Sequence, residues 1–540
     1  MKNKPYPLYD VMEIKNLKEL VNKCADTFGE KTAFMFEREK EEVCISYSQF
    51  KSDVDALGTA FYDMGIQNAK IAVIGENSYE WILSYFATVN SGNVIVPLDK
   101  ELPASDIKNI IDDAGVIALV FSDNYSDISR YLCENNIKIQ HYININSIPK
   151  LLESGEALCR NGSKYIIEFE VNNNILATLS YTSGTTGNAK GVMLSHKNLA
   201  SDIVASCRNV FFPKHSILVL PLHHASGFTG LLCMLVYGSK IAINLSLKNL
   251  SNDFNKYRPQ ITVLVPLFLE TFYKKIWDGA KKQRKEKLLK NLINISNALL
   301  MLRIDVRRVL FKSVLSHFGG ELLYVISGGA PLDKKLVDGY YSFGITILNV
   351  YGLTETAGVI STNRNDYFRS GSVGQLIPCC EVQFVGKDDN GFGEICVKGD
   401  QVLLGYYEDK QATAYTFDDK WFKTGDIGYI DEDGFLYVTG RKKNLIILSN
   451  GKNVYPEELE FSIQKHIPYI KEVVVYAGND EIIAEVFLDT ENFPDCAVQL
   501  DKDILSFNET QAAYKNINNT VIRDIEFPKT SSKKIKRQYN

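Results

Sequence analysis

The stretch Leu179-Ser180-Tyr181-Thr182-Ser183-Gly184-Thr185-Thr186-Gly187-Asn188-Ala189-Lys190-Gly191 lies between two apolar runs, residues 175–179 and 192–194. This order predicts a strand, a loop and a second strand. Hydroxyls, backbone N–H groups exposed at glycines and one lysine can together surround a phosphate chain. The loop is not a Walker A loop, because no Ser or Thr follows Lys190 and Ala189 stands where that motif has Gly. A Gly/Ser/Thr string alone is typical of a linker, but its place between strands and its lysine favour phosphate binding.

Bulk properties indicate an ordinary globular protein of several domains. The chain has 540 residues, of which 45% are apolar and 23% charged, with a net charge of −5. That charge implies no general attraction to nucleic acid, and ten scattered cysteines without a C-x-x-C pair indicate neither a zinc site nor a disulfide framework. Residues 1–7 precede no apolar h-region and no run of about 18 apolar residues occurs, so we expect a cytoplasmic protein without a transmembrane segment.

Strand and helix patterns alternate from residue 16 to residue 120, as in a layered α/β architecture. Apolar residues at helical spacing predict a helix over 16–28, and Ser48 is a candidate N-cap for a second helix ending near Tyr62. Short apolar runs at 71–74 and 94–97 predict buried strands. No internal repeat is evident.

Two histidines end a further strand expected over 217–220. Pro221-Leu222-His223-His224-Ala225-Ser226-Gly227 places His223 and His224 where open α/β sheets hold ligands. A metal pair is one interpretation, but no third ligand of suitable spacing follows in the sequence. A neutral histidine satisfied in the core is the alternative.

Two later strand ends carry groups suited to a nucleotide. Residues 322–326 lead into Ser327-Gly328-Gly329-Ala330-Pro331, where glycines let a flat ligand lie against backbone. Residues 345–350 lead into Tyr351-Gly352-Leu353-Thr354-Glu355-Thr356, which offers a ring for stacking and a carboxylate for Mg²⁺. Either segment alone is compatible with a simple turn, whereas together with the first loop they indicate a nucleotide site.

Residues 273–290 hold eight Lys or Arg and two acidic residues. A solvated helix face is the commoner explanation of such a segment. A role at a membrane surface or along an acyl chain is the alternative.

Downstream, Asp426 lies in a Thr-Gly-Asp turn, where it is either a turn residue or an acceptor for ribose hydroxyls. Arg441 begins what we expect to be a small βα domain. The chain ends in a basic tail, residues 528–537, of a kind that is ordinarily solvated.

The order of these segments, from about residue 17 to the end, resembles the adenylate-forming superfamily of acyl-CoA synthetases, luciferases and nonribosomal adenylation domains. The closest resemblance within it is to bacterial long-chain acyl-CoA synthetases. It implies an α/β fold with a large N-terminal region of several subdomains, residues 1–440, and a small mobile α+β C-terminal lid, residues 441–540.

The resemblance also implies a role for each matching position. The β- and γ-phosphates would be surrounded by Thr182, Ser183, Gly184, Thr185, Thr186, Gly187 and Lys190. The adenine pocket would be formed by Gly328, Gly329 and Ala330, with Asn349 facing the amino group and Tyr351, beside Gly352, stacking on the ring. Thr354 would touch the α-phosphate, Glu355 would bind Mg²⁺, and Asp426 and Arg441 would hold the ribose. His224 would gate the acid pocket, Lys443 would be the hinge and Lys534 the catalytic lysine of the lid. Lys533 stands where the family often has Gly, and Asn444 where an Asp is common, so the tail and hinge depart from the pattern.

The implied activity is ATP-dependent activation of a carboxylic acid through an acyl-AMP, followed by transfer to CoA. A second candidate is loading of the acyl or aryl group onto a carrier protein in trans. A third, from another class, is a catalytically inactive nucleotide-binding scaffold, against which the intact Lys190, Glu355, Asp426, Arg441 and Lys534 argue. Residues 225–230 contain no acidic residue to pair with an ammonium, so we expect a fatty or aryl acid without an α-amino group.

Overall fold

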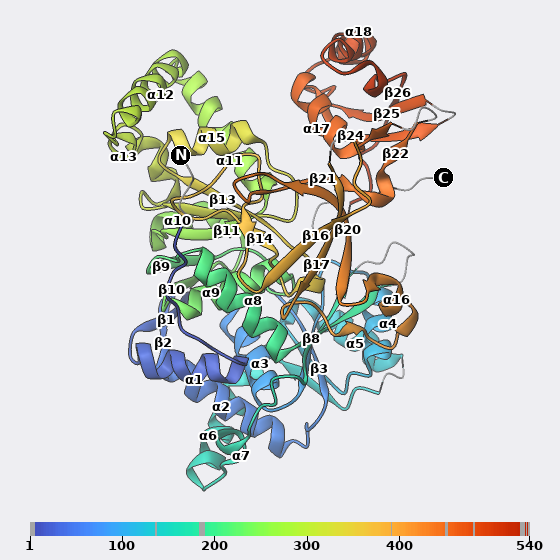
Figure 1. Cartoon of the computed structure of the whole chain (residues 1–540). Helices are drawn as coiled ribbons and strands as arrows, with labels where there is room; N and C mark the ends of the chain where they lie inside the picture. Colours follow the sequence, from blue (N-terminus) through green and yellow to red (C-terminus); the bar gives the residue numbers. More distant parts are fainter. Residues whose placement is uncertain are drawn as a thin grey trace. The chain divides into compact units, whose positions relative to one another are not determined.

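The computed structural model describes residues 6–135, 138–182, 189–389, 391–448, 452–478, 481–529, 535 and 537. These residues form a mixed α/β fold (Figure 1). The chain divides into two compact units, described separately below. The first holds residues 1–381, 398–416 and 433–435, and the second holds 382–397, 417–432 and 436–540. The predicted α/β class is confirmed, whereas the expected lid boundary at residues 440 and 441 stays a prediction.

Two large sheets organise the first unit. The nine-stranded sheet has the order β15 (Gln375–Leu376), β14 (Ser361–Thr362), β13 (Thr346–Tyr351), β12 (Tyr324–Ser327), β11 (Ile261–Leu264), β9 (His215–Leu218), β10 (Lys240–Ile243), β1 (Thr32–Arg38) and β2 (Glu41–Ser46). The seven-stranded sheet has the order β18 (Gly405–Tyr406), β8 (Lys190–Ser195), β7 (Leu176–Thr182), β4 (Val94–Pro97), β3 (Lys70–Ile74), β5 (Ala118–Phe121) and β6 (His141–Asn144). Their central strands are parallel, so several strands of each sheet end at one edge.

Helices connect and cover these strands. Those of the first unit are α1 (Leu17–Phe28), α2 (Tyr47–Asp63), α3 (Tyr79–Asn90), α4 (Ala104–Ala114), α5 (Ser126–Glu134), α6 (Ile148–Arg160), α7 (Tyr165–Glu168), α8 (His196–Asn209), α9 (Ala225–Val236), α10 (Leu250–Tyr257), α11 (Pro266–Lys282), α12 (Glu286–Met301), α13 (Arg307–Leu310), α14 (Lys312–Leu315), α15 (Lys334–Ser342) and α16 (Lys410–Thr416). Short 3₁₀ turns include η5 (Thr354–Thr356), which follows β13 after Gly352 and Leu353. The core of the nine-stranded sheet is built from fully buried side chains such as Ile217, Val325, Tyr340 and Ile347.

Side-chain caps fix where the first helices begin. Asn16 accepts a hydrogen bond from the Glu19 backbone N–H and starts α1, as the apolar spacing predicted. The second helix is capped by Ser46, which accepts from the Gln49 N–H at 3.1 Å. The prediction of Ser48 as that cap is therefore wrong, because the strand β2 runs directly into α2 and leaves Ser48 inside the first turn.

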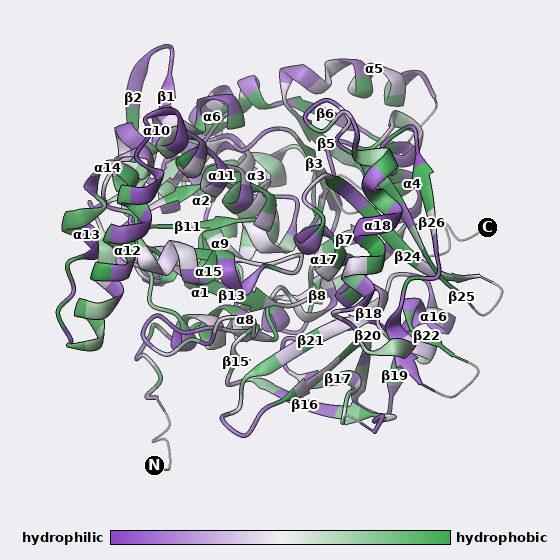
Figure 2. Ribbon diagram, turned by 90° about the horizontal axis from the view of Figure 1, so that it is seen from above, coloured by the Kyte–Doolittle hydropathy of each residue, from purple (hydrophilic) through white to green (hydrophobic). Residues whose placement is uncertain are grey.

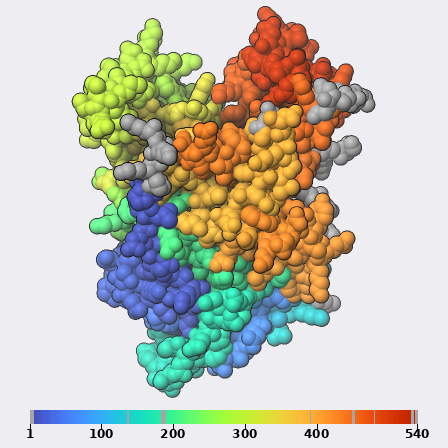
Figure 3. All heavy atoms as spheres, in the orientation of Figure 1, coloured from blue at the N-terminus to red at the C-terminus, as the bar shows by residue number. Residues whose placement is uncertain are grey.

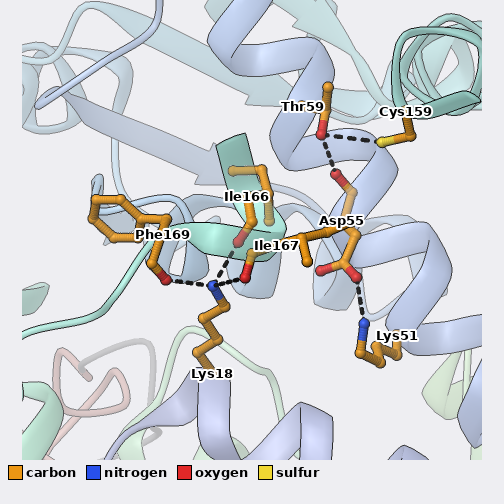
Figure 4. Close-up of polar contacts among 8 residues, drawn as sticks. All are labelled: Lys18, Lys51, Asp55, Thr59, Cys159, Ile166, Ile167 and Phe169. Carbon is orange, nitrogen blue, oxygen red and sulfur yellow. Dashed lines mark hydrogen bonds and ion pairs between the residues drawn. The ribbon is translucent and has the colours of Figure 1, made fainter. Parts of the chain in front are cut away.

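Lys18 ties α1 to the end of α7 (Figure 4). Its ammonium donates to the carbonyl oxygens of Ile166, Ile167 and Phe169. Carbonyls at the end of a helix lack intrahelical partners and attract a cation. This buried lysine therefore has a packing role, joining elements that lie together with α2 and α6 at the lower left of Figure 1.

The basic segment at residues 273–290 is not one helix. It spans the end of α11 and the start of α12, and the chain reverses between them at Arg284, which has a φ of 56°. Lysines in both helices are exposed, as a solvated face requires.

The second unit contains a five-stranded sheet that includes β16 (Cys380–Val385), β17 (Gly393–Gly399), β19 (Phe417–Asp418), β20 (Trp421–Ile430) and β21 (Leu436–Arg441). A smaller α+β part follows, with β22 (Ile446–Ile447), β23 (Asn453–Val454), α17 (Pro456–His466), β24 (Ile470–Gly478), β25 (Glu481–Leu488), α18 (Cys496–Asn508) and β26 (Asn519–Arg523). Residues of α17, β24, β25 and α18 share one buried apolar cluster. This part matches the α+β class expected for the end of the chain.

Candidate active site

The predicted phosphate-binding loop connects two paired strands. β7 and β8 are antiparallel, and their last pair joins Thr182 to Lys190. This confirms the strand–loop–strand prediction at both ends of the loop. Ser183, Gly184, Thr185, Thr186 and Gly187 lie outside the described residues.

Lys190 is linked to Glu355 through a residue that the sequence did not single out. The Tyr406 hydroxyl donates a hydrogen bond to Glu355 Oε1 at 3.1 Å, and Lys190 Nζ lies 5.2 Å from the centroid of the Tyr406 ring. β18 carries Tyr406 and pairs with β8, so main-chain hydrogen bonds hold the ring beside the lysine. Burial, followed by the Glu355 charge, raises the pKa of Tyr406, which keeps the hydroxyl protonated as a donor.

The turn that presents Glu355 depends on a close backbone approach. A Cβ on Gly352 would lie 2.0 Å from the Gly358 carbonyl oxygen, so only glycine fits there. Thr354 and Glu355 follow in η5, and the Leu403 N–H donates to the Glu355 carbonyl at 2.8 Å. The turn predicted after β13 is therefore a tightly packed element, which fixes where the Glu355 side chain begins.

The predicted adenine-binding residues lie at adjacent parallel strand ends. Gly328, Gly329 and Ala330 follow β12, while Asn349 and Tyr351 belong to β13, with Ser327 paired to Asn349.

At these strand ends, Gly328 provides backbone without a side chain and Asn349 provides a buried oxygen without a partner among the described residues. A Cβ on Gly328 would lie 2.6 Å from Val350 Cγ1, so a residue with a side chain does not fit at this position without a shift of its neighbours. Asn349 is 7% exposed and donates to the Ser372 carbonyl, but its Oδ1 has no hydrogen-bond partner among the described residues. A buried acceptor without a partner is costly and fits a ligand that donates, such as an exocyclic amino group.

His224 is the N-cap residue of α9 and is half-buried, and its ring is tilted by 53° against that of His223, with ring centroids 4.2 Å apart. Asp99, which follows β4, lies beside this pair. The sequence offered no third ligand by spacing, because Asp99 lies far upstream in another sheet. The structure brings the three side chains together.

In the second unit, the two predicted ribose-binding residues are paired. Asp426 and Arg441 are opposite each other on β20 and β21, and Arg441 Nε lies 2.8 Å from Asp426 Oδ1. The Asp426 carboxylate is 5% exposed. Lys443, the predicted hinge, lies in η6 (Lys442–Asn444), where burial, with Arg441 and Arg537 nearby, lowers its pKa.

Lys534, the predicted catalytic lysine, lies outside the described residues. Of its described neighbours, Lys529 pairs with Glu472 and Glu526, and Arg537 pairs with Glu457 and Glu460. These basic residues are thus engaged in ion pairs within the second unit, which leaves the assignment to Lys534 as a prediction.

Known proteins resemble this chain in sequence. The AMP-binding enzyme family matches residues 21–407. The long-chain-fatty-acid–CoA ligase FadD15 of Mycobacterium bovis is 28% identical over 479 residues, covering 83% of this chain and 78% of that protein. Long-chain-fatty-acid–CoA ligase 5 of Rattus norvegicus is 29% identical over 514 residues, covering 84% and 72%.

Solved structures share the fold. The anthranilate CoA ligase AuaEII with anthranoyl-AMP has a TM-score of 0.76 at 20% identity, covering 99% of this chain and 97% of that one. The o-succinylbenzoate CoA synthetase of Bacillus subtilis, with ATP and a magnesium ion, has a TM-score of 0.73 at 23% identity, covering 96% and 98%. Within the described part of the chain, no helix combines the length and the apolar character that a membrane span needs.

Proposed function

The chain belongs to the AMP-binding enzyme family, and from this premise we propose that it activates a fatty acid with ATP and transfers the acyl group to CoA, releasing pyrophosphate and AMP. The observation that carries the proposal is the link from Lys190 through Tyr406 to Glu355, which joins the phosphate-loop hairpin to the turn after β13. A cation and a candidate Mg²⁺ ligand are thereby held in one unit, as a polyphosphate requires.

The chemistry explains why these groups are needed. A carboxylate is a poor electrophile, so its oxygen attacks the α-phosphate of ATP and gives acyl-AMP, from which a thiol can displace AMP. Repulsion between two anions opposes the first step. Cations fixed at the phosphates lower that barrier by electrostatics and positioning, each by about 3–4 kcal/mol.

The residues present fit the nucleotide and its metal. Asn349 Oδ1 is a buried acceptor that suits the adenine amino group, and Tyr351 follows on the same strand. Glu355 would hold Mg²⁺, which when bound neutralises phosphate charge. In the second unit, the buried Asp426 would accept hydrogen bonds from ribose hydroxyls beside Arg441. Lys190 would orient the phosphates, and Tyr406 would keep Glu355 oriented.

The described residues favour an acid without an α-amino group, fatty or aryl. Helix α9, which follows His224, buries apolar residues over most of its length and contains no carboxylate. A buried ammonium would remain unpaired there, at a cost of several kcal/mol. The relatives' names, long-chain-fatty-acid–CoA ligases, support the same class.

Acid-dependent release of pyrophosphate tests the proposal. We expect release with ATP, Mg²⁺ and long-chain fatty acids, less with aryl acids and least with amino acids. Faster turnover of an ordinary amino acid than of any fatty or aryl acid would contradict the substrate class. Absence of pyrophosphate release with every acid would contradict the proposed activity and favour the catalytically inactive nucleotide-binding scaffold.

The acyl acceptor needs its own measurement, because a carrier protein acting in trans is the second candidate. With acyl-AMP supplied, CoA and a phosphopantetheinylated carrier protein can be compared directly. We expect thioester formation with CoA, and transfer only to the carrier would replace this part of the proposal.

We also propose that the enzyme meets membranes through the end of α12. Met301, Leu302 and Val309 are 85%, 70% and 79% exposed, and exposed Arg303 lies among them. The ribbons of α12 and α13 carry both green and purple segments in Figure 2, and the yellow-green atoms of this region form one knob in Figure 3. Exposed apolar side chains with a cation suit an anionic lipid surface.

Vesicle flotation tests this contact. Wild-type protein should float with anionic vesicles, and Leu302→Asp should reduce the floating fraction. The matched control is Val498→Asp on α18, which changes another exposed apolar residue, 87% exposed, elsewhere in the chain. Equal flotation of all three proteins would contradict the contact.

A further inference from the structure

We propose that Asp99, His223 and His224 form a binding site for a divalent cation of the zinc class. The candidate ligand atoms of these three side chains all lie within 4.8 Å of one another. His223 and His224 come from the segment between β9 and α9, whereas Asp99 follows β4 of the other sheet. The proposal goes beyond the activation of fatty acids and stands whether or not the chain has that activity.

The separation of two ligand atoms fits a tetrahedral ion. His223 Nε2 lies 3.3 Å from Asp99 Oδ1. Zinc–nitrogen and zinc–oxygen bonds of about 2.0–2.1 Å at tetrahedral angles place their ligand atoms about 3.3–3.4 Å apart. The third ligand atom, from His224, lies within 4.8 Å of these two atoms.

The ligand types select the metal. Two imidazoles and one carboxylate are a usual donor set for zinc and its neighbours in the first transition row. Mg²⁺ and Ca²⁺ prefer oxygen ligands, so this cluster is distinct in chemistry from the Mg²⁺ position proposed at Glu355.

His223 supplies the second, independent observation. Its side chain is 5% exposed, and its Nε2 is without a hydrogen-bond partner among the described residues. The nearest carboxylate oxygen, Asp99 Oδ1, already accepts from the Glu101 N–H at 2.9 Å. A buried ring nitrogen without a hydrogen-bond partner is costly, and coordination to a cation held with Asp99 would remove that cost.

The backbone around the ligands is held in place. Asn77, which follows β3, donates to the Leu220 carbonyl at 2.9 Å and accepts from the Leu222 N–H at 3.1 Å. A Cβ on Gly227 would lie 2.3 Å from the Pro221 carbonyl oxygen, so α9 begins in close contact with the same segment. The two histidines are therefore presented from a fixed turn, as a preorganised metal site requires.

Titration of the full-length protein with Co²⁺ tests the site, because Co²⁺ replaces zinc and absorbs visible light. We expect one saturable site, with a d–d spectrum typical of nitrogen and oxygen ligands. Zn²⁺ should displace the Co²⁺ and should also raise the thermal midpoint.

Three variants locate the ion. Asp99→Asn keeps the shape of the side chain, and His223→Phe fills the buried space of the ring. Both of these variants should weaken Co²⁺ binding by at least about tenfold, because even changes to residues around the metal ligands cause a loss of that size. His215→Ala, which removes an exposed histidine at the start of β9, should bind as wild type.

Three results would overturn the proposal. One is the absence of saturable Co²⁺ binding by the wild-type protein. Another is unchanged affinity in both Asp99→Asn and His223→Phe. The third is a strong thiolate-to-metal charge-transfer band, which would place the ion on cysteines. Because Asp99→Asn is nearly isosteric, its thermal midpoint without metal checks that lost binding is not lost folding.

Discussion

At the scale of single residues, the proposed role of Asn349 in nucleotide selection rests on one buried atom. Its Oδ1 lacks a partner among the described residues, while its Nδ2 is fixed by the Ser372 carbonyl at 3.1 Å. We expect wild-type protein to prefer ATP to ITP, which lacks the amino group. Asn349→Ala should reduce this preference by about tenfold, the worth of one buried hydrogen bond. The ratio of kcat/KM for the two nucleotides measures it, and a variant that loses both activities equally would contradict the assignment.

His196 makes a second prediction at this scale, because it is a buried neutral histidine at the start of α8. Its Nδ1 accepts from the Leu17 N–H, and burial lowers its pKa from 6.5 to about 4. Between these values the unfolded chain binds a proton that the folded chain does not. Protonation of the unfolded chain therefore lowers the free energy of unfolding. The contribution of the buried neutral His196 to that free energy is fully present above pH 6.5 and is lost as the pH falls towards 4.

Denaturation in urea at pH 7 and at pH 5 measures this loss. At pH 5 it should amount to about 2 kcal/mol. His196→Asn keeps an acceptor near Nδ1 but cannot be protonated, so its midpoint should fall less between the two pH values. His215→Asn, at an exposed site, should follow the wild type. Identical pH dependence in all three proteins would exclude His196 as a source of acid sensitivity.

At the scale of elements, the turn after β13 depends on Gly352. A methyl group there would lie 2.0 Å from the Gly358 carbonyl oxygen, so Gly352→Ala must displace η5 and Glu355. We expect adenylation to fall by about 100-fold or more, since a displacement of about 1 Å has such an effect. Gly279→Ala is the control: it lies in α11 with open space around its Cβ and should stabilise the helix by about 1 kcal/mol. Pyrophosphate release and thermal midpoints of both variants check the contrast.

Elements with strong local patterns could be predicted from the sequence, and contacts between distant elements could not. The strands around the phosphate loop and the helix expected over 16–28 follow from apolar runs and from apolar residues at helical spacing. The start of α2 was misplaced because Ser46 and Ser48 are equally good caps by composition, and only the path of β2 decides between them.

Within the candidate site the same limit holds. Motifs pointed to Lys190 and Glu355, but Tyr406 lies in no motif and reaches them through the pairing of β18 with β8. Asp99 joins His223 only because two different sheets end near each other. A sequence pattern carries periodicity along the chain, and it carries no signal for which distant strand ends meet.

At the scale of the molecule, the two half-reactions should separate. If the C-terminal region is a mobile lid, Lys534 is needed while the α-phosphate is attacked and not when the thiol arrives. Lys534→Ala should slow adenylation by about 10²–10³-fold, yet make thioester from supplied acyl-AMP and CoA at a near-normal rate. Rapid-quench measurement of each half-reaction checks this.

Lys533→Ala is the matched control and should affect neither half-reaction strongly. Equal loss in both half-reactions of Lys534→Ala would argue for a site that works in one conformation. A large defect in Lys533→Ala alone would move the catalytic role to that residue.

The interleaved course of the chain also bears on how the protein is made. The chain passes between the two compact units at residues 381–382, 397–398, 416–417, 432–433 and 435–436. Domains generally fold as units while the ribosome proceeds from the N-terminus. The first unit therefore stays incomplete until residue 435 has emerged. By then residues 382–397 and 417–432 of the second unit, which contain all or most of β16, β17, β19 and β20, have been made without the rest of that unit. Nascent chains of this protein should thus need protection from aggregation over a long window of synthesis, and a ribosome stalled between residues 382 and 435 should release a product in which neither unit is whole.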